Sequence, residues 1–171
     1  MSTQLVTYYL EMTDPSQLVV SPVPSEHWAV RRVGLPCPEL NRFFYYEVGA
    51  KWRWIDRLDW TDEKWLSYVG RAELETWVAY LSGTPVGYFE LESQPSGDVQ
   101  LMYFGLLPRF IGRGCGGPLL TAAVEKAWQM GPARVWVHTC SLDHPSALAN
   151  YQARGFKIFE QNTKNSWKTD D

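Results

Sequence analysis

The sequence predicts an α+β fold in which helices flank a mixed, mostly antiparallel sheet. Three apolar strand patterns follow one another with short turns between them, which is typical of an antiparallel meander. A glycine-rich loop then joins the third strand to a helix, and the crossover after it favours a parallel pairing for the next strand. With 171 residues, 45% of them hydrophobic, we expect one core and a single domain over residues 1–171.

The N-terminal part, about residues 1–75, carries weaker patterns than the rest. Thr61 has the residue type of a helix N-cap, and the acidic residues after it suit the positive end of a helix. Gly49 is a plausible helix end. We expect short strands at 5–10 and 27–33, and helices at 39–48 and 62–69.

The second part, about residues 76–160, has clearer periodicity. Ser82-Gly83-Thr84-Pro85 predicts a hairpin turn, and Gly131-Pro132 predicts a sharp helix end. We expect strands at 76–81, 86–91 and 99–107, a helix after the glycines, a strand at 134–139, a helix at 147–153, and strands at 156–159 and 166–168.

The glycine cluster Ile111-Gly112-Arg113-Gly114-Cys115-Gly116-Gly117 predicts an anion site. Glycines let the backbone approach a ligand closely, and the first turn of the following helix leaves N–H groups unpaired. Pro118 just inside the helix strengthens this interpretation over a turn kept only for packing. A dinucleotide fingerprint also fits the spacing alone, but the next strand ends in His138-Thr139-Cys140 without the acidic residue which that fold requires. No Gly-Lys-Ser/Thr follows, which excludes a nucleoside-triphosphate P-loop.

Composition excludes several functional classes. The net charge of −3 and the scattered 16 Lys and Arg residues argue against nucleic-acid binding. The three cysteines form no CxxC pair, so we expect neither a disulfide framework nor a metal site, but thiols in a reducing cytoplasm. Neither a signal-peptide pattern nor a long apolar run occurs, so a soluble, cytoplasmic protein without membrane contact is expected.

Two segments resemble motifs of the GNAT superfamily of acyl-CoA-dependent N-acyltransferases. Leu106-Leu-Pro-Arg-Phe-Ile-Gly-Arg-Gly-Cys-Gly-Gly117 is similar to the family's pyrophosphate loop, Gln/Arg-x-x-Gly-x-Gly/Ala. Pro145-Ser-Ala-Leu-Ala-Asn-Tyr-Gln-Ala-Arg-Gly-Phe156 is similar to its Ala-x-x-x-Tyr-x-x-x-Gly-Phe element. Both motifs occur in the family's order within about residues 76–160, while residues 1–75 match only in having two helices where the family builds its acceptor site.

The resemblance implies acetyl-CoA as cosubstrate, no metal, and a splayed pair of parallel strands. Backbone N–H groups of the glycine loop would hold the pyrophosphate, and the central strand would bulge and pair with the pantetheine arm. Gly105 inside a strand is independently a bulge signal. The implied acyl-CoA-binding residues are Phe104, Gly105, Leu106, Arg109, Ile111, Gly112, Arg113, Gly114, Cys115, Gly116, Gly117, His144 and Ala147.

Two positions depart from the family pattern. Ile111 stands where relatives have Gln or Arg, so one side-chain contact to phosphate is missing, and Arg109 is a possible substitute. His144 stands where many relatives carry Asn. The backbone donors of the loop survive both changes. Arg109 and Arg113 meet CoA phosphates or remain solvated, and we weigh the two alternatives equally.

Acetyl transfer to an amine requires a proton acceptor, a polarised thioester carbonyl and a proton for the departing thiolate. By spacing, Ala147 and Tyr151 share one helix face, and the resemblance makes Tyr151 the acid; otherwise its ring would be assigned to the core. The resemblance also assigns the carbonyl contact to the Leu106 N–H. For the base we prefer Glu90, with Glu92, His138 or water as open alternatives.

The expected function is an N-acetyltransferase that passes an acetyl group directly from acetyl-CoA to an amine of a small molecule or peptide. The acceptor-side aromatic residues Trp52, Trp54 and Trp60 favour an amine with an apolar portion, although core packing explains them equally well. A non-catalytic acyl-CoA-binding or partner-binding module on the same fold is the alternative, and a nicotinamide- or flavin-binding domain ranks last. The resemblance also makes a homodimer possible.

Overall fold

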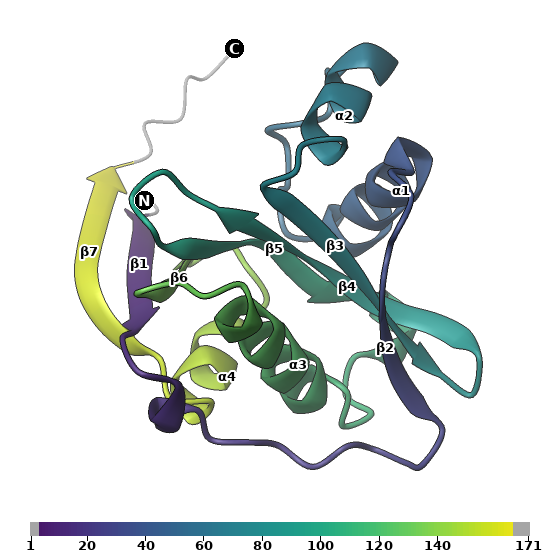
Figure 1. Cartoon of the computed structure of the whole chain (residues 1–171). Helices are drawn as coiled ribbons and strands as arrows, with labels where there is room; N and C mark the ends of the chain where they lie inside the picture. Colours follow the sequence, from purple (N-terminus) through teal and green to yellow (C-terminus); the bar gives the residue numbers. More distant parts are fainter. Residues whose placement is uncertain (1–3, 166–171) are drawn as a thin grey trace.

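One seven-stranded sheet, in the order β2-β3-β4-β5-β6-β1-β7, runs through the protein (Figure 1). The computed structural model describes residues 4–165. The strands are Gln4–Met12 (β1), Trp28–Arg32 (β2), Leu74–Leu81 (β3), Thr84–Ser93 (β4), Val99–Leu106 (β5), Val135–Cys140 (β6) and Lys157–Asn165 (β7). Every neighbouring pair is antiparallel except β5 and β6.

Two pairs of helices cover opposite faces of this sheet (Figure 1). They are Pro38–Gly49 (α1) and Asp62–Val69 (α2) on one face, and Gly116–Gln129 (α3) and Ala147–Ala153 (α4) on the other. Because side chains alternate along a strand, Tyr88 stacks on Phe44 of α1 with ring centroids 4.8 Å apart, whereas Phe89 joins the core beneath α3. Two short 3-10 turns, Pro15–Gln17 and Pro108–Phe110, complete the elements.

The fold class, the meander and the crossover to a parallel strand are confirmed. The helix predicted at 62–69 has those bounds, and the Thr61 hydroxyl accepts a hydrogen bond from the backbone N–H of Lys64, as expected of an N-cap. The first and last described strands are longer than predicted. The predicted strand at 166–168 lies outside the described residues.

The position of β1 was not predicted. This strand lies between β6 and β7 and pairs antiparallel with both, in the interior of the sheet rather than at an edge (Figure 1). Leu10 and Met12 on this strand are completely buried and belong to the main core. β1 is therefore what joins β7 to the rest of the sheet.

The parallel strands β5 and β6 separate soon after they begin. Only Val99 with Val135 and Gln100 with Trp136 are in register, although both strands continue beyond these pairs. The expected splay is confirmed. It leaves one backbone edge of β5 without a strand partner, and this edge forms a wall of the site described below.

The predicted bulge at Gly105 is wrong in its position. Gly105 pairs in regular register with Tyr88, whereas the shift occurs where Glu90 faces Tyr103 and Leu91 faces Leu101, which leaves Met102 as the extra residue. A Cβ at Gly105 would clash with Val48 of α1. Position 105 thus requires glycine because helix α1 approaches the strand closely there.

Candidate active site

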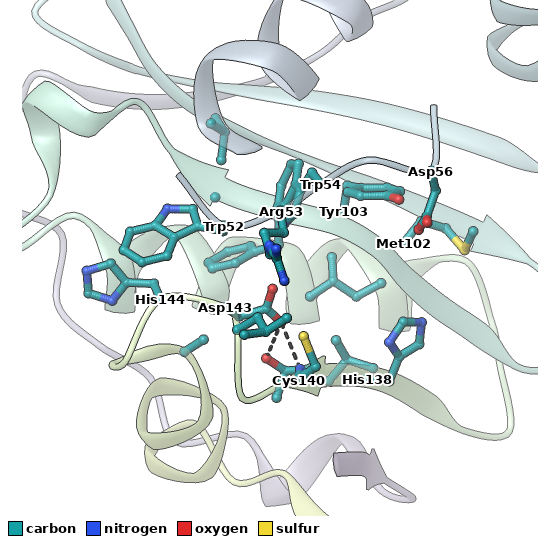
Figure 2. A pocket seen from close by; sticks show the side chains of 18 of the residues that line it. Trp52, Arg53, Trp54, Asp56, Met102, Tyr103, His138, Cys140, Asp143 and His144 are labelled. Atoms are coloured by element: carbon teal, nitrogen blue, oxygen red, sulfur yellow. Dashed lines mark hydrogen bonds between the residues drawn. The ribbon is translucent and has the colours of Figure 1, made fainter. Parts of the chain in front are cut away.

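A cavity of about 1520 Å³ opens where β5 and β6 diverge. Its walls come from these two strands, from the segment between α1 and α2, from the glycine loop and from α4. Figure 2 shows His144 at one end of the cavity, and Asp56, Met102 and His138 at the other. After the ligands that the sequence analysis predicts for them, we call these the cofactor end and the acceptor end.

The glycine loop, residues 112–117, supplies free backbone donors at the cofactor end. Gly112 and Gly114 have φ angles of +80° and +77°, in the left-handed region that glycine adopts without strain. Within residues 4–165, none of the N–H groups from Gly112 to Gly117 donates a hydrogen bond to a protein acceptor. The loop therefore presents a run of amide hydrogens that suits an anion.

The start of α3 fixes this loop. The first helical bond runs from the Leu119 N–H to the Cys115 carbonyl at 3.0 Å, and Pro118 has no N–H to satisfy. The Asn150 side chain on α4 donates to the Gly116 carbonyl at 3.1 Å. At Gly117, a Cβ would clash with Arg154 and Ser21. These contacts hold the loop in place, while its backbone N–H groups have no protein acceptor within the described residues.

The free edge of β5 directs further donors into the splay. The Leu107 N–H bonds the Val86 carbonyl on β4 at 2.8 Å. Because alternate residues of a strand direct their N–H groups to the same side, those of Phe104 and Leu106 point away from β4, toward the space that β6 has left. A third strand-like chain would fit there.

Only some of the side chains predicted to bind acyl-CoA near the glycine loop line the cavity. Ile111 lines the cavity together with Gly112 and Gly116. Arg109 and Arg113 are both exposed and do not line it, and the Arg113 guanidinium lies 5.7 Å from the ring centroid of Phe110. Cys115 is buried at the start of α3, and burial raises the pKa of its thiol.

His144 lines the cavity just before α4. Its Nδ1 accepts a hydrogen bond from the Ser146 N–H at 3.0 Å, and its ring meets Trp52 edge-on with centroids 4.9 Å apart. Ala147 lines the same wall. His144 and Trp52, which come from different segments of the chain, thus meet at the cofactor end, an arrangement that the sequence did not reveal (Figure 2).

Tyr151 on α4 reaches the cavity from the core side of the sheet. Its ring packs against Phe104 and Phe156, with centroids 6.1 Å and 5.9 Å away. Within the described chain, its hydroxyl has no hydrogen-bond partner. Burial, and secondarily the charge of Asp143, raise the pKa of this phenol, which therefore stays protonated at neutral pH and can donate a proton.

Glu90 lies at the centre of a buried polar cluster rather than on the cavity wall. Its side chain is completely buried, and both carboxylate oxygens accept hydrogen bonds from Arg57 at 3.2 Å. The Asn41 amide and the Tyr68 hydroxyl donate to the same carboxylate at 2.9 Å and 2.7 Å. With its acceptor sites taken and no access to the cavity, Glu90 is poorly placed to accept a proton from a substrate, so the geometry does not support its predicted role as base.

Sequence reasoning missed Arg57. Its guanidinium lies 4.1 Å, 4.2 Å and 4.7 Å from the ring centroids of Tyr68, Tyr103 and Trp60. Burial lowers its pKa, but the Glu90 carboxylate together with Tyr68 and Tyr103 raises it overall, so the guanidinium stays charged. The only signal in the sequence was a basic residue within the aromatic stretch 51–60, which has no regular period.

The alternative bases Glu92 and His138, and the nearby Asp143, which was not predicted as a base, differ in whether protein groups already bind them. Glu92 lines the cavity but is paired with Arg71 at 2.8 Å. Asp143 accepts hydrogen bonds from the Thr139 hydroxyl and the Cys140 N–H at 2.6 Å and 2.9 Å (Figure 2). His138 lines the cavity, and within residues 4–165 its ring nitrogens have no hydrogen-bond partner.

Within residues 4–165, no group of three or more His, Cys, Asp or Glu side chains is arranged to hold a metal ion. None of the described helices combines the length and apolar character needed to span a membrane.

Comparisons with known proteins agree with this architecture. A model of the acetyltransferase (GNAT) family matches residues 37–156. No curated protein sequence matches this chain significantly. A GCN5-related N-acetyltransferase from Kribbella flavida superposes with a TM-score of 0.66 at 16% identity, covering 91% of this chain and 55% of that chain.

Two further solved structures are similar in fold. A GCN5-related N-acetyltransferase from Sphaerobacter thermophilus has a TM-score of 0.65 at 19% identity, covering 93% of this chain and 50% of that one. An aminoglycoside acetyltransferase from an uncultured soil metagenomic sample has a TM-score of 0.66 at 15% identity, covering 85% and 99%. The chain spans about half the length of the Kribbella and Sphaerobacter proteins. With the family match over most of its length, the chain belongs to the acetyltransferase (GNAT) family.

Proposed function

We propose that the protein is an N-acetyltransferase that passes an acetyl group from acetyl-CoA directly to an amine of a small molecule or peptide. The observation that carries this proposal is the run of unpaired amides from Gly112 to Gly117 beside the free edge of β5. A diphosphate needs several donors close together, and a pantetheine arm needs backbone groups that can pair with it. The chain offers both along one continuous cavity.

The same features assign roles at the cofactor end. The loop amides would hold the pyrophosphate, and the Phe104 N–H would pair with the pantetheine amides. The Leu106 N–H would polarise the thioester carbonyl.

The side chains at this end would add weaker contacts. Those of Ile111, His144 and Ala147 would pack along the pantetheine arm. Arg109 and Arg113, which are exposed near the loop, would add long-range attraction for phosphate rather than fixed contacts.

In the transfer step, the amine nitrogen attacks the thioester carbon, and the carbon–sulfur bond then breaks. Tyr151 would give its phenolic proton to the departing thiolate: its raised pKa keeps the phenol protonated until that step, and its hydroxyl is not engaged by another described group. Glu90 would act indirectly, because its ion pair fixes Arg57 and with it the aromatic rings of the acceptor wall. A homodimer and a cytoplasmic location remain predictions.

Two measurements test the proposal. Isothermal titration of acetyl-CoA, CoA and NAD should show binding of the first two only. A free-thiol assay with acetyl-CoA and a panel of primary amines should then show amine-dependent release of CoA. Binding without turnover of any amine would favour the non-catalytic acyl-CoA-binding module, and absence of binding would overturn the proposal.

A further inference from the structure

His138 occupies the narrow end of the splay. It lies two residues beyond Trp136, the last residue of β6 that is in register with β5, and continuation of this register would bring it opposite Met102. Figure 2 shows both side chains at the acceptor end of the cavity. An amine that reaches the free edge of β5 from the acceptor end would pass this imidazole.

The ring points to the face of the sheet from which an acceptor can enter. Val137 is buried in the core beneath α3, and alternation places His138 on the opposite face. There the main contacts of α1 and α2 with the sheet are to β3, β4 and β5. Tyr9 on β1 flanks the ring, with centroids 5.8 Å apart, while the side chain still reaches solvent.

The surroundings keep this imidazole neutral. Packing against protein lowers its pKa, and the carboxylates of Asp143 and Asp56 only partly oppose this. Of the nearby cations, Arg134 is balanced by Glu11 and Asp98, and Lys164 lines the cavity from β7. A neutral ring without a hydrogen-bond partner in the described chain has a lone pair available to a ligand.

Asp56 lies across the cavity from His138 (Figure 2). Within the described chain, its carboxylate forms neither an ion pair nor a hydrogen bond. The neighbouring Arg57 does not satisfy it, because that guanidinium is bound to Glu90. On the same wall as Asp56 lie the rings of Trp54 and Tyr103, whose centroids are 4.8 Å apart (Figure 2). An unpaired carboxylate beside aromatic faces suits an ammonium group on an apolar or aromatic body.

We propose that the acceptor is a primary amine with an aromatic or apolar body, that Asp56 binds its ammonium form, and that His138 accepts the proton which frees the nitrogen for attack. This inference rests on the proposed function. Two protons leave the nitrogen overall. The first passes to His138 and then to solvent, and the second replaces, through solvent, the proton that Tyr151 gives to the CoA thiolate.

The test uses the full chain with acetyl-CoA and 2-phenylethylamine as the probe. His138→Gln should lower kcat/KM for the amine by about 10²-fold or more, with the Kd of acetyl-CoA unchanged. The matched control is His27→Gln, because His27 is exposed, lies near Glu26 and does not line the cavity. This control should retain the activity of the original chain.

The pH profile separates a proton acceptor from a structural residue. In the original chain the amine is already in its ammonium form below its own pKa, so kcat/KM should stay level there and show an extra fall only below the lowered pKa of His138, because a protonated imidazole cannot accept a proton. His138→Gln should lose this extra fall, and imidazole added to His138→Ala should restore part of the activity. An unchanged profile in His138→Gln, or no rescue of His138→Ala, would overturn the assignment.

Asp56→Asn tests the substrate class. The KM for 2-phenylethylamine should rise about tenfold with little change in kcat, whereas Asp59→Asn, an exposed neighbour outside the cavity, should leave KM unchanged. Equal KM values in both variants, or preference for 2-aminoethanol over 2-phenylethylamine, would overturn the proposed acceptor. Failure of the original chain to bind acetyl-CoA would instead contradict the proposed function, so the two failures can be told apart.

Discussion

The two ends of the cavity are built in different ways. The cofactor end consists largely of backbone groups from one short loop and one strand edge, and its left-handed glycines Gly112 and Gly114 are exposed. The acceptor end depends on side chains brought together from distant positions, among them Asn41, Arg57 and Glu90, all three buried. The function proposed for the cofactor end thus depends on local backbone geometry, whereas the function proposed for the acceptor end depends on the stability of the whole fold.

Tyr151→Phe is expected to have the largest effect, at the junction of the two ends. Removal of the phenolic proton donor should lower kcat by about 10²–10⁴-fold. The Kd of acetyl-CoA, measured by titration calorimetry, should not change. Tyr46→Phe is the control, because Tyr46 is exposed on α1 and does not line the cavity. Equal rates in the two variants would remove Tyr151 from the chemistry.

Glu90→Gln should test the acceptor end through stability. The substitution leaves Arg57 buried without its counter-ion, so urea denaturation should show a free energy of unfolding lower by about 3–5 kcal/mol. Glu73→Gln, at an exposed position, should change it very little. A Glu90→Gln variant of normal stability that lacks only turnover would instead point to a direct chemical role for this carboxylate.

Gly114→Ala should act on the cofactor end with a smaller effect. The φ angle of +77° costs a non-glycine residue about 1–2 kcal/mol, which should weaken acetyl-CoA binding up to about tenfold as the loop adjusts. Gly97→Ala is a matched control, with a φ of +87° and open space around it, in the turn between β4 and β5. It should lose stability but keep the Kd of acetyl-CoA. A similar loss of affinity in both variants would contradict a specific role for the loop.

The difference between the two ends also explains what the sequence could reveal. The glycine loop, its helix and the meander are local patterns in the sequence. The separation of the parallel strands β5 and β6 was predicted only from the resemblance to the GNAT superfamily. The Arg57–Glu90 pair joins residues 33 positions apart, one of them in a stretch without regular periodicity, so no local pattern indicated it. Gly105 was correctly noticed but misinterpreted, because close approach of Val48 and a bulge favour the same residue type.

The interior position of β1 has a consequence for how the chain folds. β1 precedes both of its partners in the chain, so its hydrogen bonding cannot be completed until β6 and then β7, whose Asn165 pairs with Gln4, have been synthesised. Contacts between such distant segments slow folding and leave strand edges exposed meanwhile. During translation, β1 should therefore expose unpaired backbone edges until β6 and β7 have emerged, which makes it a segment where aggregation can begin.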